Sequence, residues 1–100
     1  MKVTRTHGLT KQGAKSKVED MIPELMRQYG GSLSEMIKSW EGDEMRFSFI
    51  AAGMSIKGIV SVGESDVVLD MPVPLMLRPF ESRIRAKIEE EIDGVLTPLP

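Results

Sequence analysis

The sequence predicts an α+β fold with two layers: a curled antiparallel sheet of about five strands with two helices on one face. Residues 45–74 contain three apolar runs with a period of two, separated by turns at Gly53 and Gly63, as in an antiparallel meander. Two other segments, 10–29 and 79–94, carry apolar residues at steps of three or four, which is typical of amphipathic helices. The expected order is therefore strand, helix, four strands, helix.

The first expected element is a short strand over Lys2–His7. Val3, Arg5 and His7 point to one side of it, and its weakly apolar character favours a position at the edge of the sheet. We place it beside the last strand of the meander, so that the sheet begins to close. Gly8 ends the strand.

A helix follows, with the hydroxyl of Thr10 as its N-cap. Its apolar stripe consists of residues spaced by three or four: Ala14, Val18, Met21, Ile22, Leu25 and Tyr29. Pro23 lacks an N–H group and its ring crowds the preceding turn, so we expect a kink there or two shorter helices. Gly30 and Gly31 end the helix, one of them in the left-handed C′ conformation.

The meander is preceded by one more strand, over Ser34–Trp40, and a turn at residues 41–43 joins the two. Gly58 lies inside an expected strand, which indicates a bulge, a bend or the close approach of a helix.

Residues 71–80 are almost wholly apolar but contain Pro72, Pro74 and Pro79. We expect a strand end that continues into an extended connector with partly buried side chains. Pro79 is expected at the first position of the last helix, and Gly94 at its end. The stripe of this helix is Phe80, Ile84, Ile88, Ile92 and Val95, and we place the helix across the concave face of the sheet. The core is predicted to contain Phe47, Phe49, Ile56, Val60, Leu69, Ile84, Ile88 and Ile92.

The composition limits the classes of function. One hundred residues suffice for a single domain, 1–100, with a modest core and a frayed tail at 97–100. A formal net charge of −2 gives no support for nucleic acid as a partner, because phosphate binding requires a concentrated basic surface. The absence of cysteine excludes disulfides, thiolate catalysis and Cys-based zinc sites. No secretory signal and no transmembrane segment is visible, so the expected compartment is the cytoplasm.

Signatures of catalysis are weak. His7 is the only histidine, and at a strand end before Gly8 it is expected to bond to the backbone of the turn. The acidic residues gather mainly in turns, where they serve turn chemistry and solubility. Gly30-Gly31 has no following lysine and precedes a strand, so it matches no phosphate-binding loop. We therefore assign no catalytic, metal-binding or cofactor-binding residue and favour a protein that is not an enzyme.

A resemblance extends along nearly the whole chain. It is carried by turns, glycines and apolar positions: His7-Gly8-Leu9, Ala14, Trp40 with Gly42 and Asp43, Phe47, Gly53, Gly58-Ile59-Val60, Val73 to Arg78, Pro79, Ile84, Ile88 and Ile92-Asp93. On these residues the chain resembles the small bacterial "putative polyhydroxyalkanoic acid system" proteins, whose genes lie beside polyester-storage genes. Pro23 and the pair Pro72/Pro74 depart from that family's pattern. The resemblance implies a link to polyhydroxyalkanoate granules or their metabolism and supplies no catalytic residues.

Two functions from different classes remain open. The first is a non-enzymatic binding or accessory protein that contacts a granule component, or a second copy of itself as a homodimer. Its predicted contact residues are Leu75, Met76, Leu77 and Phe80, because contiguous exposed apolar residues usually mark contacts. The alternative is a binding protein or enzyme for a small apolar ligand of hydroxyacyl type, with a cavity between the sheet and the C-terminal helix.

The volume of that cavity separates the two functions. Ligand pockets measure about 300–1,000 Å³, and we expect a core of this size to have little spare room. The eight methionines are many for this length. They are interpreted as core filling, with a pliable apolar groove as the alternative. If the first function holds, Leu75 and Met76 are at least partly exposed in the monomer and covered in the complex.

Overall fold

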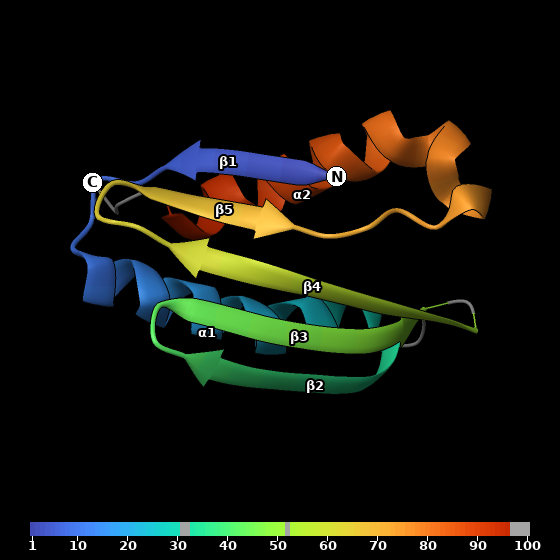
Figure 1. Cartoon of the computed structure of the whole chain (residues 1–100), viewed down its shortest axis with the longest axis horizontal. Helices are drawn as coiled ribbons and strands as arrows, with labels where there is room; N and C mark the ends of the chain where they lie inside the picture. The colour runs from blue at the N-terminus through green and yellow to red at the C-terminus, as the bar shows by residue number, and fades with distance from the viewer. Residues whose placement is uncertain (31–32, 52, 97–100) are drawn as a thin grey trace.

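The computed structural model describes residues 1–30, 33–51 and 53–96 and has the predicted α+β architecture. Its elements are β1 (Lys2–Thr6), α1 (Lys11–Tyr29), β2 (Leu33–Glu41), β3 (Glu44–Ala51), β4 (Met54–Val62), β5 (Asp66–Asp70), the short 3₁₀-helix η1 (Leu75–Phe80) and α2 (Glu81–Leu96). The five strands form one antiparallel sheet in the order β1-β5-β4-β3-β2, and both α-helices lie on the same face of it (Figure 1).

The edge strand β1 pairs with β5, as predicted, with Val3 opposite Leu69. The sheet is open, because β1 and β2 each have one unpaired side. The Oγ1 atom of Thr10 accepts a hydrogen bond of 3.0 Å from the N–H group of Gly13, which confirms the predicted N-cap.

The prediction of two shorter helices at Pro23 is wrong, because α1 runs through it without a break. The proline removes one backbone hydrogen bond, and the buried side chains of Ala14 and Val18 hold the helix on the sheet. Gly30 is right-handed, with φ −57°, so it is not a left-handed cap. A Cβ atom at this position would collide with the carbonyl oxygen of Met26, and this close approach explains the glycine. Gly31 and the side chains of Leu25 and Tyr29 lie outside the part of the chain that the structure describes.

Strands β3 to β5 form the predicted meander, and β2 precedes it. Left-handed glycines lie in the turns before β3 and before β4: Gly42 at φ +62° and Gly53 at φ +77°. Gly58 on β4 lies opposite Phe47 on β3, and the register of β4 with both neighbours is unbroken. A Cβ atom at Gly58 would lie 2.9 Å from the Cε1 atom of the Phe47 ring. The predicted close approach therefore exists, but it comes from a ring on the next strand and not from a helix.

Residues 71–80 differ from the predicted extended connector. The backbone of Met71 pairs with that of Met1, with a Met71 N to Met1 O distance of 2.9 Å. Residues 75–80 then coil into η1, where the Leu77 N–H group donates to the carbonyl of Pro74 at 2.8 Å. A 3₁₀ turn accommodates this sequence because it needs few backbone donors and tolerates a proline before its first bonded N–H.

The bounds of the last helix also differ from the prediction. Pro79 lies inside η1, and α2 begins at Glu81. It continues through Gly94 to Leu96, whose side chain is buried, whereas Val95 is only partly buried. Glycine inside a helix costs about 1 kcal/mol relative to alanine, and burial of a leucine side chain offsets that cost. The predicted frayed tail, 97–100, lies outside the described residues.

The core contains half of the predicted set. Buried residues include Ile56, Val60, Leu69 and Ile92. The other predicted members are half-buried: Phe47, Phe49, Ile84 and Ile88. Their incomplete burial has one cause, because all four border an open cleft between the sheet and the helices.

Candidate functional site

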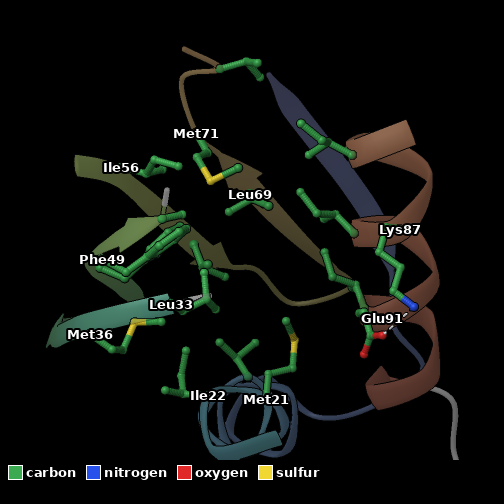
Figure 2. Close-up of a pocket in the computed structure, with 18 of the residues that line it drawn as sticks. Met21, Ile22, Leu33, Met36, Phe49, Ile56, Leu69, Met71, Lys87 and Glu91 are labelled. Carbon is green, nitrogen blue, oxygen red and sulfur yellow. Dashed lines mark ion pairs between the residues drawn. The ribbon is translucent and has the colours of Figure 1, made fainter. Parts of the chain in front are cut away.

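An apolar cleft of about 510 Å³ lies between the inner face of the sheet and the two α-helices. In Figure 2, α1 forms one side of this cleft, α2 another, and the strands the remaining wall. The buried side chains of Met45, Ile56 and Val60 form part of its floor. Ile84 and Ile88 face it from α2.

The expectation of little spare room is therefore wrong. The close backbone neighbours of α2 are α1, β1 and η1, whereas α1 approaches β4. Between them, the two helices leave part of the inner face of β3, β4 and β5 uncovered, and this part lines the cleft. A volume of about 510 Å³ lies within the range of ligand-binding pockets.

The lining of the cleft is apolar except for three residues on α2: Arg83, Lys87 and Glu91. The Nζ atom of Lys87 lies 3.3 Å from a carboxylate oxygen of Glu91, so two of the three form an ion pair (Figure 2). The interior of the cleft therefore offers almost no polar group for recognition, and polar contacts are confined to one wall.

Four of the eight methionines line the cleft: Met21, Met36, Met45 and Met71. Methionine is unbranched and polarizable, and binding surfaces that adapt to their ligand use it often. Met45 and Met71 are also buried members of the core, as the core-filling interpretation has it, whereas Met21 and Met36 are only partly buried on the wall of the apolar groove.

The four residues predicted for contact divide between a surface patch and the cleft. Leu75, Met76 and Phe80 are 78%, 77% and 50% exposed, and we call these three the η1 patch. Leu77 instead lines the cleft. The η1 patch holds three of the four large apolar side chains that are exposed in the described residues, the fourth being Ile37 on β2. In Figure 1, η1 lies beyond the end of β5, on the connection between the sheet and α2.

Sequence reasoning missed the charged wall of the cleft. Arg83, Lys87 and Glu91 recur every four residues, beside the apolar positions Ile84 and Ile88. That spacing places the charged series and the apolar stripe side by side on the helix, which was the available signal.

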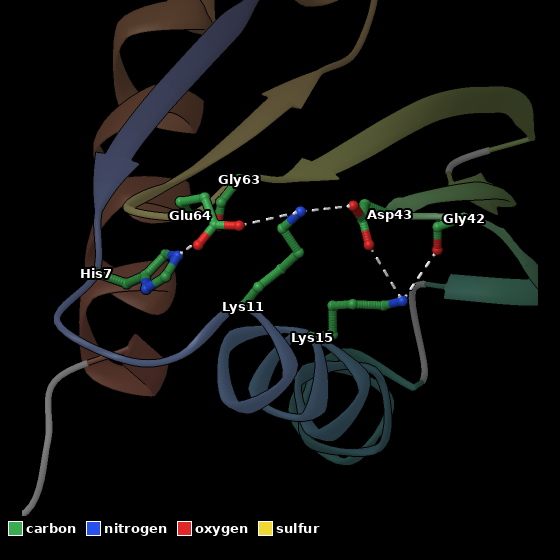
Figure 3. Close-up of polar contacts among 7 residues, drawn as sticks. All are labelled: His7, Lys11, Lys15, Gly42, Asp43, Gly63 and Glu64. Atoms are coloured by element: carbon green, nitrogen blue, oxygen red, sulfur yellow. Dashed lines mark hydrogen bonds and ion pairs between the residues drawn. The ribbon is translucent and has the colours of Figure 1, made fainter.

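A second group of polar residues lies away from the cleft, at the N-terminal end of α1 (Figure 3). The Nζ atom of Lys11 lies 3.0 Å from Asp43 and 3.5 Å from Glu64, and Lys15 lies 3.5 Å from Asp43. The hydrogen bond from Lys11 lowers the pKa of the Asp43 carboxyl, and the same bond raises the pKa of Lys11. Lys15 also lies 5.0 Å from the centre of the Trp40 ring. These contacts join α1 to two turns of the sheet.

His7 is 5% exposed and bonds to backbone through both ring nitrogens, as predicted. Its Nδ1 atom accepts from the N–H group of Leu9 at 3.2 Å, so Nδ1 carries no proton there. Its Nε2 atom then donates to the carbonyl of Gly63 at 3.0 Å (Figure 3). This arrangement gives the imidazole a structural task and leaves neither nitrogen directed at a substrate.

Metal binding and membrane insertion are two further properties that bear on function. No group of three or more His, Asp or Glu side chains is placed to hold a metal ion among residues 1–30, 33–51 and 53–96. Neither helix in that part of the chain has the length and the apolar character needed to cross a membrane.

Comparison with known proteins identifies a family. A family model described as "Putative polyhydroxyalkanoic acid system protein" matches residues 1–96, which include every strand and helix, the cleft and the η1 patch. No curated protein and no solved structure matches the sequence. The match covers nearly the whole chain and confirms the resemblance carried by its turns, glycines and apolar positions, so the chain belongs to the family of putative polyhydroxyalkanoic acid system proteins.

Proposed function

We propose that this chain is a cytoplasmic, non-enzymatic accessory protein of a polyhydroxyalkanoate system, and that it binds a granule component through the η1 patch. The observation that carries the proposal is the exposure of Leu75 and Met76, at 78% and 77%, on a segment that lies beyond the end of β5. Large apolar side chains that cluster in water favour contact with another apolar surface. The family name supplies the link to the polyester.

The local backbone also supports this assignment. Pro74 precedes η1 and Pro79 lies within it, so the segment that carries the patch has restricted backbone freedom before it binds. A pre-stiffened segment loses less conformational entropy when it is ordered against a partner. Exposure and stiffness together favour a contact role over a purely structural one.

The test is sedimentation of the purified protein with isolated polyester granules. Leu75→Asp/Met76→Asp should strongly reduce the fraction that sediments, because it places two charges in an apolar contact. The thermal midpoint of unfolding should change little, since both side chains are already in water.

Ile37→Asp is the matched control. Ile37 is 65% exposed on β2, remote from η1, so the same apolar-to-acidic change should leave sedimentation intact. Equal sedimentation of the wild type and the double variant would refute the role of the η1 patch. Equal losses for the double variant and Ile37→Asp would show that any added charge disturbs binding.

The cleft supports a second candidate function, which is binding of a small apolar ligand. Its volume of about 510 Å³ and its apolar lining are the specific observations in favour. The two functions are separable, because the η1 patch lies outside the cleft wall and only Leu77 of η1 enters it.

A further inference from the structure

The positive charge of the C-terminal segment is concentrated in its first half. Residues 75–87 carry four basic side chains and one acidic side chain, whereas every charged residue in 88–96 is acidic. Because 75–87 comprises η1 and the first half of α2, the positive half lies where Leu77 and Ile84 enter the wall of the cleft.

The acidic half of α2 is occupied by contacts within the protein. Arg5 on β1 binds Glu89 at 3.2 Å and also binds both carboxylate oxygens of Asp93. Glu91 pairs with Lys87 at 3.3 Å. The negative charges closest to the cleft are thus balanced by the protein itself, and Lys87 is the residue of the positive half with which Glu91 pairs.

Arg83 is the charged residue of the cleft wall whose guanidinium has no partner. No hydrogen bond or ion pair joins it to any residue that the structure describes. Its side chain is exposed, one helical turn before Lys87 and next to Ile84. A guanidinium holds five N–H donors in a planar fork that binds a carboxylate through two parallel hydrogen bonds.

We propose that the cleft binds an unbranched aliphatic chain that ends in a carboxylate, with the chain between the sheet and Ile84 and Ile88, and the carboxylate on Arg83. This proposal rests on the second candidate function and adds the chemistry of the head group. The apolar interior fits the chain but has no donor for a carboxylate, so the head group stays on the charged wall. Fatty acids, hydroxy acids and the acid end of a short polyester share this chemistry.

Other occupants fit the same wall less well. A cationic amphiphile would bring a like charge to Arg83. An apolar segment from a second copy of the chain would cover the guanidinium without giving its N–H groups an acceptor. A neutral chain would leave the guanidinium in water and gain nothing from it.

The test compares dodecanoate with dodecanol by titration calorimetry on the full chain, at ligand concentrations below those that form micelles. One dodecanoate molecule should bind per protein, about 2–5-fold more tightly than dodecanol, which is the upper part of the range for an exposed charge pair. From octanoate to dodecanoate, each methylene group should tighten binding by up to about fourfold while the cleft still has room.

Substitution of Arg83 assigns the head-group site. Arg83→Gln should remove the preference for dodecanoate and leave the affinity for dodecanol unchanged, whereas Arg83→Lys should retain part of the preference. Arg85→Gln is the matched control, because Arg85 lies on the same helix outside the cleft wall and carries the same charge. A purely structural effect of Arg83 would weaken both probes together.

Four results would overturn the proposal. Equal affinity for dodecanoate and dodecanol in the wild type would refute the carboxylate site on Arg83 and would still support binding of a small apolar ligand. Absence of binding by every probe would refute both, without touching the granule assay on the η1 patch. If Arg83→Gln keeps the preference for dodecanoate, the carboxylate binds elsewhere. If the preference appears only with micelles or anionic vesicles, the positive charge serves contact with a lipid surface.

Discussion

At the scale of single residues, His7 joins two loops through its ring. Its Nδ1 atom accepts from the N–H group of Leu9, its Nε2 atom donates to the carbonyl of Gly63, and the residue is only 5% exposed. Two partly buried backbone groups, the Leu9 N–H and the Gly63 carbonyl, are therefore bound by one side chain.

We expect His7→Ala to lower the free energy of unfolding by about 1–3 kcal/mol, because it leaves those two backbone groups unpaired. Urea denaturation followed by circular dichroism measures this loss. Granule sedimentation and dodecanoate binding should stay within a few fold of the wild type. A fall in either by about a hundredfold, in a folded variant, would contradict the structural role and indicate acid–base chemistry.

Residue-level inference from the sequence succeeded where a local pattern determines the environment. The alternation in β4 and β5 predicted the buried positions Ile56, Val60 and Leu69, because successive side chains of a strand point to opposite faces. It failed for Phe47 and Phe49, which the pattern assigns correctly to the inner face but which the helices leave half-covered. Arg83 gave no signal by itself, because its environment depends on the distance between layers.

At the scale of elements, α2 has two parts with different packing. Its C-terminal part is fixed by the buried Ile92 and by the bonds from Arg5 to Glu89 and Asp93. In its N-terminal part, Ile84 and Ile88 are half-buried beside the cleft. The helix is therefore anchored at one end and borders an open space at the other.

We expect Ile92→Ala to cost about 2–5 kcal/mol of unfolding free energy, the usual range for a buried isoleucine. Ile88→Ala should cost less, about 1–2 kcal/mol, because its side chain already borders water and leaves no sealed cavity. Chemical denaturation of the two variants measures the difference. Equal losses would mean that the cleft closes around Ile88 in solution, and a loss below about 1 kcal/mol for both would make α2 peripheral.

The sequence predicted the number, type and order of the main elements, because periods of two and of about 3.6 residues are properties of the local chain. The ends of the elements were less predictable. The propensities of Pro79 and Gly94 favoured helix ends at these residues. In the structure Pro79 lies inside η1, and α2 continues beyond Gly94 because Leu96 is buried. Helical periodicity also could not reveal the cleft, since it specifies which face of α2 is apolar and not how far the helix sits from the sheet.

At the scale of the whole molecule, ion pairs connect the helices to the sheet. Asp43 pairs with Lys11 of α1, and Asp93 of α2 pairs with Arg5 of β1. Glu19 of α1 accepts hydrogen bonds from Lys38 and Trp40 on β2. Hydrogen bonds from these partners lower the pKa of all three carboxyls below their ordinary values.

The protein should therefore lose stability at acid pH. A carboxyl whose pKa is lowered on folding stabilises the folded state above its unfolded pKa, and this contribution disappears as the pH falls through the folded value. Within α1, hydrogen bonds from Arg27 and Gln28 lower the pKa of Glu24 from 4.5 to about 2. Unfolding free energy measured by urea titration should be flat near neutrality and decline from about pH 4 toward pH 2.

Asp93→Asn provides the check on this explanation. It removes one of the titrating carboxyls while keeping a side chain of nearly the same shape, so the acid decline should become shallower and the stability near neutral pH should fall. All of these carboxyls are partly exposed to solvent, so added salt should weaken the effect. If the pH profile of Asp93→Asn matched that of the wild type, the ion pair between α2 and β1 would not contribute to the loss of stability at acid pH.

The contact between Phe47 and Gly58 should make the state of the cleft visible in a proton NMR spectrum. The Phe47 ring lines the cleft and stacks on Phe49, with ring centroids 6.0 Å apart, while its edge reaches the backbone of Gly58 on the neighbouring strand. The ring current of an aromatic side chain alters the resonance frequencies of the protons beside it. Gly58 lies outside the cleft wall, yet the chemical shifts of its α-protons should change whenever the ring reorients. Ligand binding in the cleft can therefore be followed by proton NMR without a label.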